Sequence, residues 1–173
     1  MERNRRYWLI GWLIGGTTCF GLIALGLVLW LQFVQRVEPC SLCIWQRLAD
    51  VLMLLLLGLG ALWKPLRFGL WVLAACAALG GAVLALQQWQ LATSVSGQGV
   101  CSAVQLLPSS HWGGHSFADH LSAAFAGQGS CALAGQQTLA GWPLTHWSLL
   151  FFLGAALAIM VALLLSWQLR RSS

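Results

Sequence analysis

Long apolar stretches dominate the chain and alternate with shorter polar connections. They cover about residues 8–33, 44–63, 68–86 and 147–167. Each is close to the ~20 residues that an α-helix needs to cross a bilayer. The pattern therefore predicts an all-α membrane protein, a bundle of four transmembrane helices in one domain that spans residues 1–173.

Two polar connections interrupt this pattern, at about residues 35–43 and 87–146. In the longer one, Phe117, Leu121 and Phe125 recur every four residues. This spacing predicts a short amphipathic helix that lies on the membrane surface.

Several glycines lie inside the expected helices, namely Gly58, Gly60, Gly80 and Gly81. In membrane proteins small residues usually mark places where helices approach one another closely. We therefore expect these glycines to lie at helix contacts.

The composition agrees with a membrane protein. Hydrophobic residues make up 59% of the chain and charged residues only 8%, whereas a soluble domain carries about 25% charged residues. The eleven tryptophans fit the headgroup region, which indole rings favour. The net charge of +5 comes from few residues, so we expect contact with a lipid bilayer and none with nucleic acid.

The basic residues predict an orientation, because cytoplasmic loops carry an excess of Lys and Arg. Seven of the nine lie at the two termini and between the second and third apolar runs: Arg3, Arg5, Arg6, Lys64, Arg67, Arg170 and Arg171. Both termini of a multi-pass protein of the bacterial inner membrane would then be cytoplasmic. Both polar connections would face the periplasm.

The six cysteines fall into two groups. Cys19 and Cys76 lie inside apolar runs, where we expect small buried hydrophobic side chains. The other four lie in the polar connections, and the expected orientation puts them in the oxidising compartment, where disulfides persist. These are Cys40, Cys43, Cys101 and Cys131.

The segment Pro39-Cys40-Ser41-Leu42-Cys43 is the strongest chemical motif. Cysteines separated by two residues often have thiolates stabilised by a helix N-terminus or a nearby cation. Here the second helix begins at the pair, and Arg47 follows one helical turn later. A zinc site needs about four ligands. A Cys40–Cys43 disulfide would close so short a loop that it would stabilise the fold only weakly. The motif therefore favours redox chemistry, although Arg47 alone could also simply reach the interface.

Cys101 and Cys131 are thirty positions apart. A bridge between them could be purely structural, worth about 3–4 kcal/mol in the loop-entropy account, or it could exchange with the first pair. His111 and His115 have a metal-compatible spacing but no evident third ligand, so we expect no metal site. Asp50 could pair with Arg47 or belong to a proton path.

The stretch from Pro39 to Arg47 resembles the signature of the DsbB family of disulfide bond formation proteins, and the four helices and the second cysteine pair match as well. The resemblance implies a thiol oxidase that uses ubiquinone or menaquinone. A reduced DsbA-like periplasmic thioredoxin-fold protein would attack Cys101, which would be paired with Cys131. Cys131 would then pass electrons to Cys40.

The same resemblance implies that Cys43 would lie beside the quinone and that Arg47 would stabilise the developing negative charge. Family members often have a basic residue or histidine near the end of the third helix. Here Gln88 stands in that neighbourhood, and we expect it to hydrogen-bond a quinone carbonyl.

Two other functions fit parts of the sequence. A non-catalytic membrane scaffold with structural disulfides would hold the same cysteines in static bridges. An oxidoreductase resembling vitamin K epoxide reductase would have its CxxC motif late in the helix order rather than before the second helix.

Overall fold

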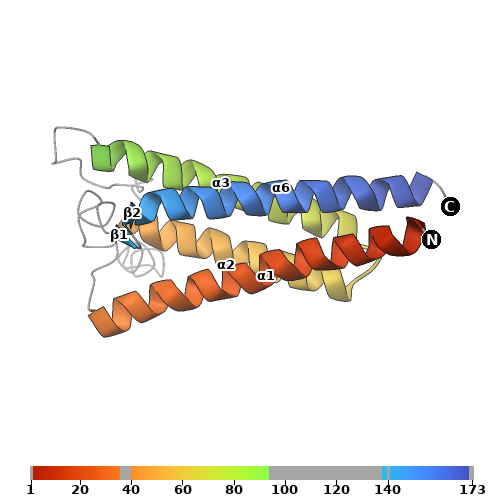
Figure 1. The fold of residues 1–173 in the computed structure, drawn as a ribbon, viewed down its shortest axis with the longest axis horizontal. Helices are drawn as coiled ribbons and strands as arrows, with labels where there is room; N and C mark the ends of the chain where they lie inside the picture. The colour runs from red at the N-terminus through yellow and green to blue at the C-terminus, as the bar shows by residue number, and fades with distance from the viewer. Residues whose placement is uncertain (1, 36–39, 94–137, 140, 172–173) are drawn as a thin grey trace, which may run out of the picture.

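The computed structural model describes residues 2–35, 40–93, 138–139 and 141–171. They form α1 (Glu2–Gln35), α2 (Ser41–Leu62), α3 (Arg67–Thr93), β1 (Thr138–Leu139), β2 (Trp142–Pro143) and α6 (Leu144–Arg171). Successive helices run in opposite directions, so both termini lie at the same end of the bundle (Figure 1). The expected amphipathic helix at Phe117, Leu121 and Phe125 lies outside the described residues.

All four helices are long and apolar enough to cross a membrane, which confirms the predicted fold class. Their outward faces carry large hydrophobic side chains, among them Leu55 and Leu157, which are 58% and 67% exposed. In water such a surface would be costly, but hydrocarbon solvates it well. The chain is therefore a multi-pass membrane protein.

The helices extend beyond the apolar runs, and the expected bounds need correction at several ends. α1 spans Glu2–Gln35, α2 begins at Ser41, α3 continues to Thr93, and α6 spans Leu144–Arg171. The extra residues of α3, Gln87-Gln88-Trp89-Gln90-Leu91-Ala92-Thr93, include neither Gly nor Pro. Glutamine, leucine and alanine are good helix formers, so the helix continues after the hydrophobic run has ended.

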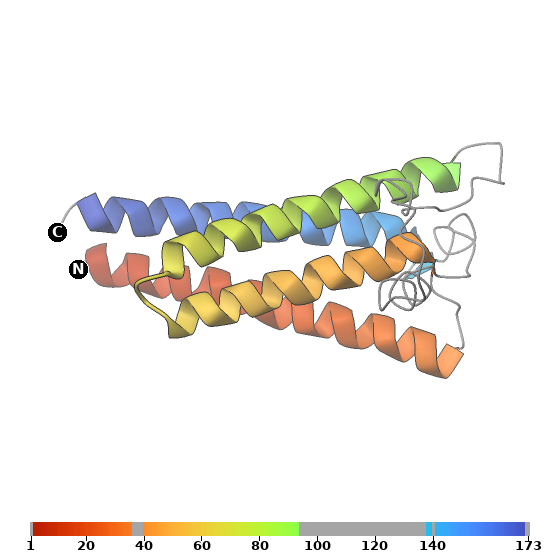
Figure 2. The ribbon, with the colours of Figure 1, turned by 180° about the vertical axis from the view of Figure 1, so that it is seen from behind.

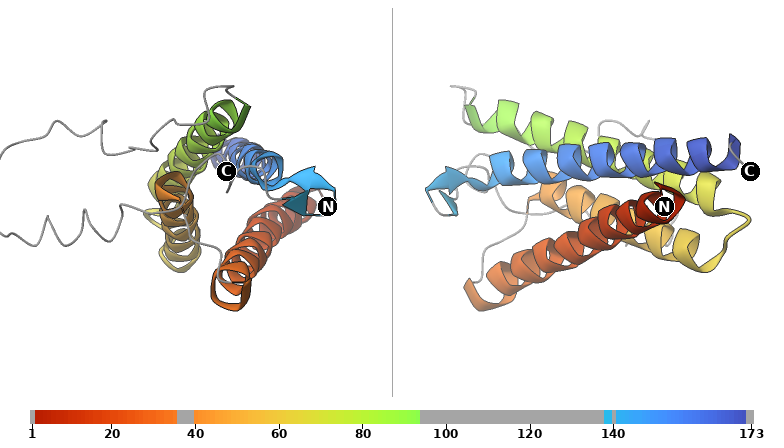
Figure 3. Two further views of the ribbon diagram at one scale, coloured as in Figure 1. Left: turned by 90° about the vertical axis from the view of Figure 1, so that its left-hand side faces the viewer. Right: turned by 45° about the vertical axis from the view of Figure 1, so that its right-hand side comes forward.

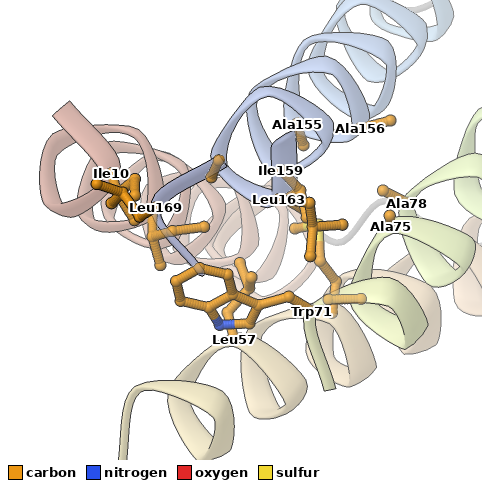
Figure 4. Packing of buried hydrophobic residues seen from close by; sticks show 14 residues of the cluster. Ile10, Leu57, Trp71, Ala75, Ala78, Ala155, Ala156, Ile159, Leu163 and Leu169 are labelled. Atoms are coloured by element: carbon orange, nitrogen blue, oxygen red, sulfur yellow. The ribbon is translucent and has the colours of Figure 1, made fainter. Parts of the chain in front are cut away.

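The interior of the bundle is built from all four helices (Figure 4). Trp71 of α3 is 3% exposed, and Leu57 of α2 and Ile159 of α6 are fully buried. Ile10 of α1 and Leu169 of α6 belong to the same core. Alanines fill much of the remaining space on α3 and α6, which lets these backbones come close together.

Two of the four singled-out glycines lie at close helix contacts. A Cβ atom added to Gly60 would lie 2.6 Å from Cδ1 of Trp71, and one added to Gly81 would lie 2.7 Å from Cζ of Phe152. The prediction is confirmed for these two. It is wrong for Gly58 and Gly80, where an added Cβ meets nothing within 4 Å.

The two cysteines of the apolar runs do not lie in the core. Cys19 of α1 and Cys76 of α3 are both exposed free thiols, so the expected burial is wrong. Since lipid-facing and core-facing positions are equally apolar, the hydrophobic pattern does not distinguish them.

α1 packs against the bundle only over its first part. Its buried residues are Ile10, Ile14, Thr17 and Gly21. From Leu22 to Leu31 every side chain is at least partly exposed. Accordingly, the second half of α1 diverges from α2 in the rear view (Figure 2) and in the oblique view (Figure 3).

A small hairpin lies at the end of the bundle opposite the termini, next to the start of α6 (Figure 3). β1 and β2 pair antiparallel, and Gly141 has a φ of 82°, a left-handed conformation that suits glycine in a tight turn. The indole N–H of Trp147 donates to the carbonyl of Leu139 at 3.1 Å. This bond fastens the hairpin to the first turn of α6.

Candidate functional site

Cys40 is the N-cap residue of α2. Its backbone is extended, with φ −77° and ψ 160°, and its sulfur accepts a hydrogen bond from the backbone N–H of Cys43 at 3.2 Å. N-cap side chains usually offer oxygen to that N–H. Here sulfur takes the same role, so the spacing of the CxxC motif is also the spacing of a helix cap.

Cys43 therefore lies in the first turn of α2, not in the preceding loop as the apolar pattern suggested. The expectation that the pair sits where this helix begins is confirmed. Unpaired backbone N–H groups give this end of a helix a partial positive charge, which stabilises an anion. A thiolate at either sulfur benefits from this field.

The two sulfurs differ in their surroundings. Cys40 is fully buried, and Leu84 and Leu91 of α3 pack against the cluster that it forms with Leu42. Cys43 is only partly buried. A hydrogen bond with the Cys43 side chain and, next, burial raise the pKa of the Cys40 thiol well above its usual range. Cys40 is therefore the sulfur that keeps its proton when the pair is reduced.

Gln88 of α3 lies directly against the pair and is 3% exposed. Its side-chain Nε2 donates to Sγ of Cys43 at 3.3 Å and lies 3.8 Å from Sγ of Cys40. The structure thus brings Gln88 together with both cysteines of the motif. It does so because α3 extends past its apolar run and carries this residue up to the start of α2.

Gln46 is a site residue to which the sequence analysis gave no role. It is 8% exposed, and its Nε2 donates to Oε1 of Gln88 at 2.9 Å. One sequence feature could have identified it: Gln46 is a glutamine within a membrane helix, one turn after Cys43. Such a side chain needs a buried hydrogen-bond partner, because lipid offers none.

Arg47 follows on α2 and is partly buried. Its guanidinium lies near enough to Cys43 and Cys40 to interact with both electrostatically. The structure therefore gathers Cys40, Cys43, Arg47 and Gln88 at one end of the bundle.

Asp50 lies one turn after Arg47 and is 5% exposed. Its Oδ1 has no hydrogen-bond partner among the described residues. This oxygen would lie 3.1 Å from a Cβ atom added to Gly21. It therefore points toward α1, and the glycine leaves room for it.

The other expected site residues lie outside the described ranges. These are Cys101, Cys131, His111, His115 and residues 36–39.

A family comparison addresses the chain as a whole. The profile described as "Disulfide bond formation protein DsbB" matches residues 6–162. This range includes the CxxC motif, all of α2 and α3, and both cysteines of the long connection.

Individual relatives agree with this match. A disulfide bond formation protein B from Chromohalobacter salexigens is 36% identical over 152 residues, which is 82% of either chain. The one from Hahella chejuensis is 33% identical over 147 residues, 79% of this chain and 84% of the relative. The one from Methylobacillus flagellatus is 32% identical over 164 residues, 88% and 91%. No solved structure matches significantly. With its four membrane helices and its cysteine pair capping α2, the chain belongs to the DsbB family of disulfide bond formation proteins.

Proposed function

We propose that the protein is a membrane thiol oxidase. It reoxidises a DsbA-like periplasmic dithiol protein and passes the electrons through two cysteine pairs to ubiquinone or menaquinone. The family membership supports disulfide formation as the reaction. One observation supports the electron path. Hydrogen-bond donors and the cation of Arg47 lie close to the sulfurs of Cys40 and Cys43 at the start of α2.

The relay begins at the second cysteine pair. A thiolate of the reduced partner attacks Cys101, which breaks the Cys101–Cys131 disulfide, forms a mixed disulfide and leaves Cys131 as the leaving thiolate. The partner's second thiol then displaces Cys101, and the partner departs with a new disulfide. Two electrons and two protons have moved from the partner to this pair.

The second exchange brings those electrons to the membrane boundary. Cys131 attacks Cys40, which breaks the Cys40–Cys43 disulfide, forms a Cys131–Cys40 mixed disulfide and leaves the negative charge on Cys43. Cys101 then attacks Cys131, which re-forms the Cys101–Cys131 disulfide and releases Cys40 as a thiol. The backbone N–H groups that begin α2, the Nε2 of Gln88 and the guanidinium of Arg47 stabilise the charge on Cys43. Because Cys40 keeps its proton more readily, the partly exposed Cys43 is the sulfur that donates the electron pair.

The residues around Cys43 fit a quinone. Leu84 and Leu91 supply an apolar surface, and Arg47 and Gln88 supply donors of the kind that bind carbonyl oxygens. The Nε2 of Gln88 donates to both sulfurs, at 3.3 Å to Cys43 and 3.8 Å to Cys40. Its longer contact with Cys40 would be exchanged for a carbonyl while the other amide hydrogen remains on Cys43. A quinone held there would supply a two-electron, two-proton acceptor, so that Cys40 and Cys43 could return to the disulfide with one partner disulfide made for each quinone reduced.

We place both termini in the cytoplasm and all four reactive cysteines at the periplasmic face of the inner membrane. Seven of the nine basic residues on the terminal side support this orientation, and the termini share one end of the bundle (Figure 1). Labelling of intact cells with a membrane-impermeant thiol reagent tests it. Protection of Cys101 and Cys131 after mild reduction, with labelling only in broken cells, would contradict the orientation.

The decisive assay uses the purified protein in lipid nanodiscs with a water-soluble quinone analogue. We expect quinone reduction to require a reduced DsbA-like protein and to stop after one equivalent of quinone per equivalent of dithiol. Protein whose cysteines have been alkylated serves as the control. Equal rates with and without the dithiol protein would refute the proposed function, and static disulfides that resist the partner would favour a scaffold.

A further inference from the structure

Two carboxamides that belong to different helices form a buried pair beside the cysteines. Gln46 of α2 and Gln88 of α3 are 8% and 3% exposed. The Nε2 of Gln46 donates to the Oε1 of Gln88 at 2.9 Å, and the Nε2 of Gln88 donates to Cys43. The three side chains thus form a chain of hydrogen bonds that ends on sulfur.

We propose that Gln46 is a positioning residue of the redox site, which holds the carboxamide of Gln88 with its N–H side toward Cys40 and Cys43. This inference rests on the proposed function of the cysteine pair and adds a residue that touches neither sulfur. Gln46 acts only through Gln88.

The two ends of a carboxamide group form different hydrogen bonds. Its nitrogen donates hydrogen bonds and its oxygen only accepts them. With the nitrogen toward Cys43, the side chain stabilises the thiolate; with the oxygen toward Cys43, it stabilises the protonated thiol and repels the thiolate. If the Gln88 carboxamide rotates by half a turn, it therefore stabilises the protonated thiol of Cys43 instead of the thiolate.

Gln46 selects between these two orientations. As long as its N–H points at Gln88, the turned carboxamide would place nitrogen against nitrogen, with two donors facing each other. A buried polar group without a hydrogen-bond partner is destabilising, and lipid supplies no substitute partner. Both side chains carry no charge, so the arrangement stays the same over the pH range in which thiols titrate.

The alternative is that the glutamine pair only joins α2 to α3, as interhelical hydrogen bonds do in membranes. Both accounts predict some loss of stability when Gln46 is replaced. Only the positioning account predicts a change in the protonation of Cys43 that depends on Gln88.

The test measures the alkylation rate of Cys43 in the reduced full-length protein, without quinone or partner, as a function of pH and with site-resolved mass spectrometry. Methionine matches the shape of glutamine without its polar groups. We expect Gln88→Met to slow alkylation at pH 7 by about tenfold, the effect of one hydrogen bond to a charged group, and Gln46→Met by about threefold, that of a neutral bond. Gln90→Met, at an exposed position on the same helix, is the matched control and leaves the rate unchanged.

Two features of the pH profile distinguish a change in the ionisation of Cys43 from a change in how easily the alkylating reagent reaches it. The alkaline plateau of the rate, where Cys43 is fully ionised, stays unchanged, and the profile moves to higher pH. In the Gln88→Met background, adding Gln46→Met causes no further shift. If Gln46→Met fails to fold, as judged by its thermal melt, Gln46→Ala removes the same donor with less bulk.

Other outcomes overturn the inference. If the pH profile of Cys43 alkylation is unchanged in both Gln46→Met and Gln46→Ala, the hydrogen bond between Gln46 and Gln88 is only an interhelical contact. An equal shift with and without Gln88 would mean that Gln46 acts on the sulfur directly. Since this assay contains neither quinone nor partner, a positive result stands even if the protein fails to reduce quinone, and a negative one leaves the proposed function intact.

Discussion

The backbone N–H of Cys43 donates a hydrogen bond to the sulfur of Cys40 at 3.2 Å. One bond thus caps α2 and ties together the two sulfurs of the motif. The same cap puts Cys43 into the first helical turn, where the field of the helix favours negative charge. This backbone bond by itself lowers the pKa of Cys40. The pKa is nevertheless raised, because the hydrogen bond with the Cys43 side chain and the burial of Cys40 outweigh it.

The reduced pair should therefore show two distinct reactivities. Since the hydrogen bond with Cys43 and burial raise the pKa of Cys40, we expect Cys40 to be alkylated more slowly than Cys43 between pH 6 and pH 9. Thiolates, not thiols, react with alkylating reagents. Site-resolved mass spectrometry of the reduced protein after timed exposure to iodoacetamide measures both rates.

A variant checks the cause. Cys43→Ala removes the largest contribution that raises the pKa of Cys40, so the pKa should fall and Cys40 should ionise at lower pH. Its alkylation profile then moves toward lower pH, although burial keeps the maximal rate low. Equal rates at the two cysteines of the wild-type protein would contradict the assignment of Cys40 as the proton-holding sulfur.

Replacing Cys43 by serine should abolish quinone reduction, because serine has a hydroxyl group of similar size but no redox chemistry at this position. Stopped-flow measurement of quinone reduction by the partner-driven enzyme gives the rate. Cys19→Ser is the matched control, since Cys19 is an exposed thiol on α1 that the relay does not use. Full turnover by Cys43→Ser would remove this sulfur from the mechanism.

The charge of Arg47 should matter more than its length. Arg47→Met keeps a long side chain and loses the cation, and we expect kcat/KM for quinone to fall by about tenfold or more, as for the loss of one charge-assisted hydrogen bond. Arg47→Lys retains the charge and should recover part of the loss. If both variants keep the wild-type KM and kcat, Arg47 serves only as an anchor at the membrane interface.

Much of this architecture could be predicted from the sequence. The apolar runs predict four spanning helices, because a helix needs a fixed length to cross hydrocarbon. The CxxC motif at the start of the second run predicts sulfurs at a helix N-terminus, and the cap at Cys40 confirms it. These predictions depend on local sequence alone.

What the sequence did not predict depends on contacts between distant residues. The hydrogen bond from Gln46 to Gln88 joins positions 42 residues apart, and its existence depends on how far α3 extends past its apolar run. Likewise, Cys19 and Cys76 lie on lipid-facing surfaces that are as hydrophobic as the core. Without a polar face the period of the pattern carries no information about which side is buried.

The neighbouring glycines of α3 offer a last test of the packing. Gly81 faces the ring of Phe152 on α6, whereas an atom added at Gly80 meets nothing within 4 Å. We expect Gly81→Leu to destabilise the protein by about 1–3 kcal/mol, because overpacking forces two helices apart. Gly80→Leu should be neutral or slightly stabilising, since leucine is the better helix former by about 0.5–1 kcal/mol and its side chain faces lipid. Thermal unfolding in one detergent, followed by circular dichroism, compares the two. Equal melting temperatures would mean that α3 and α6 do not approach each other at Gly81 as closely as the structure shows, and would place their contact elsewhere along the helices.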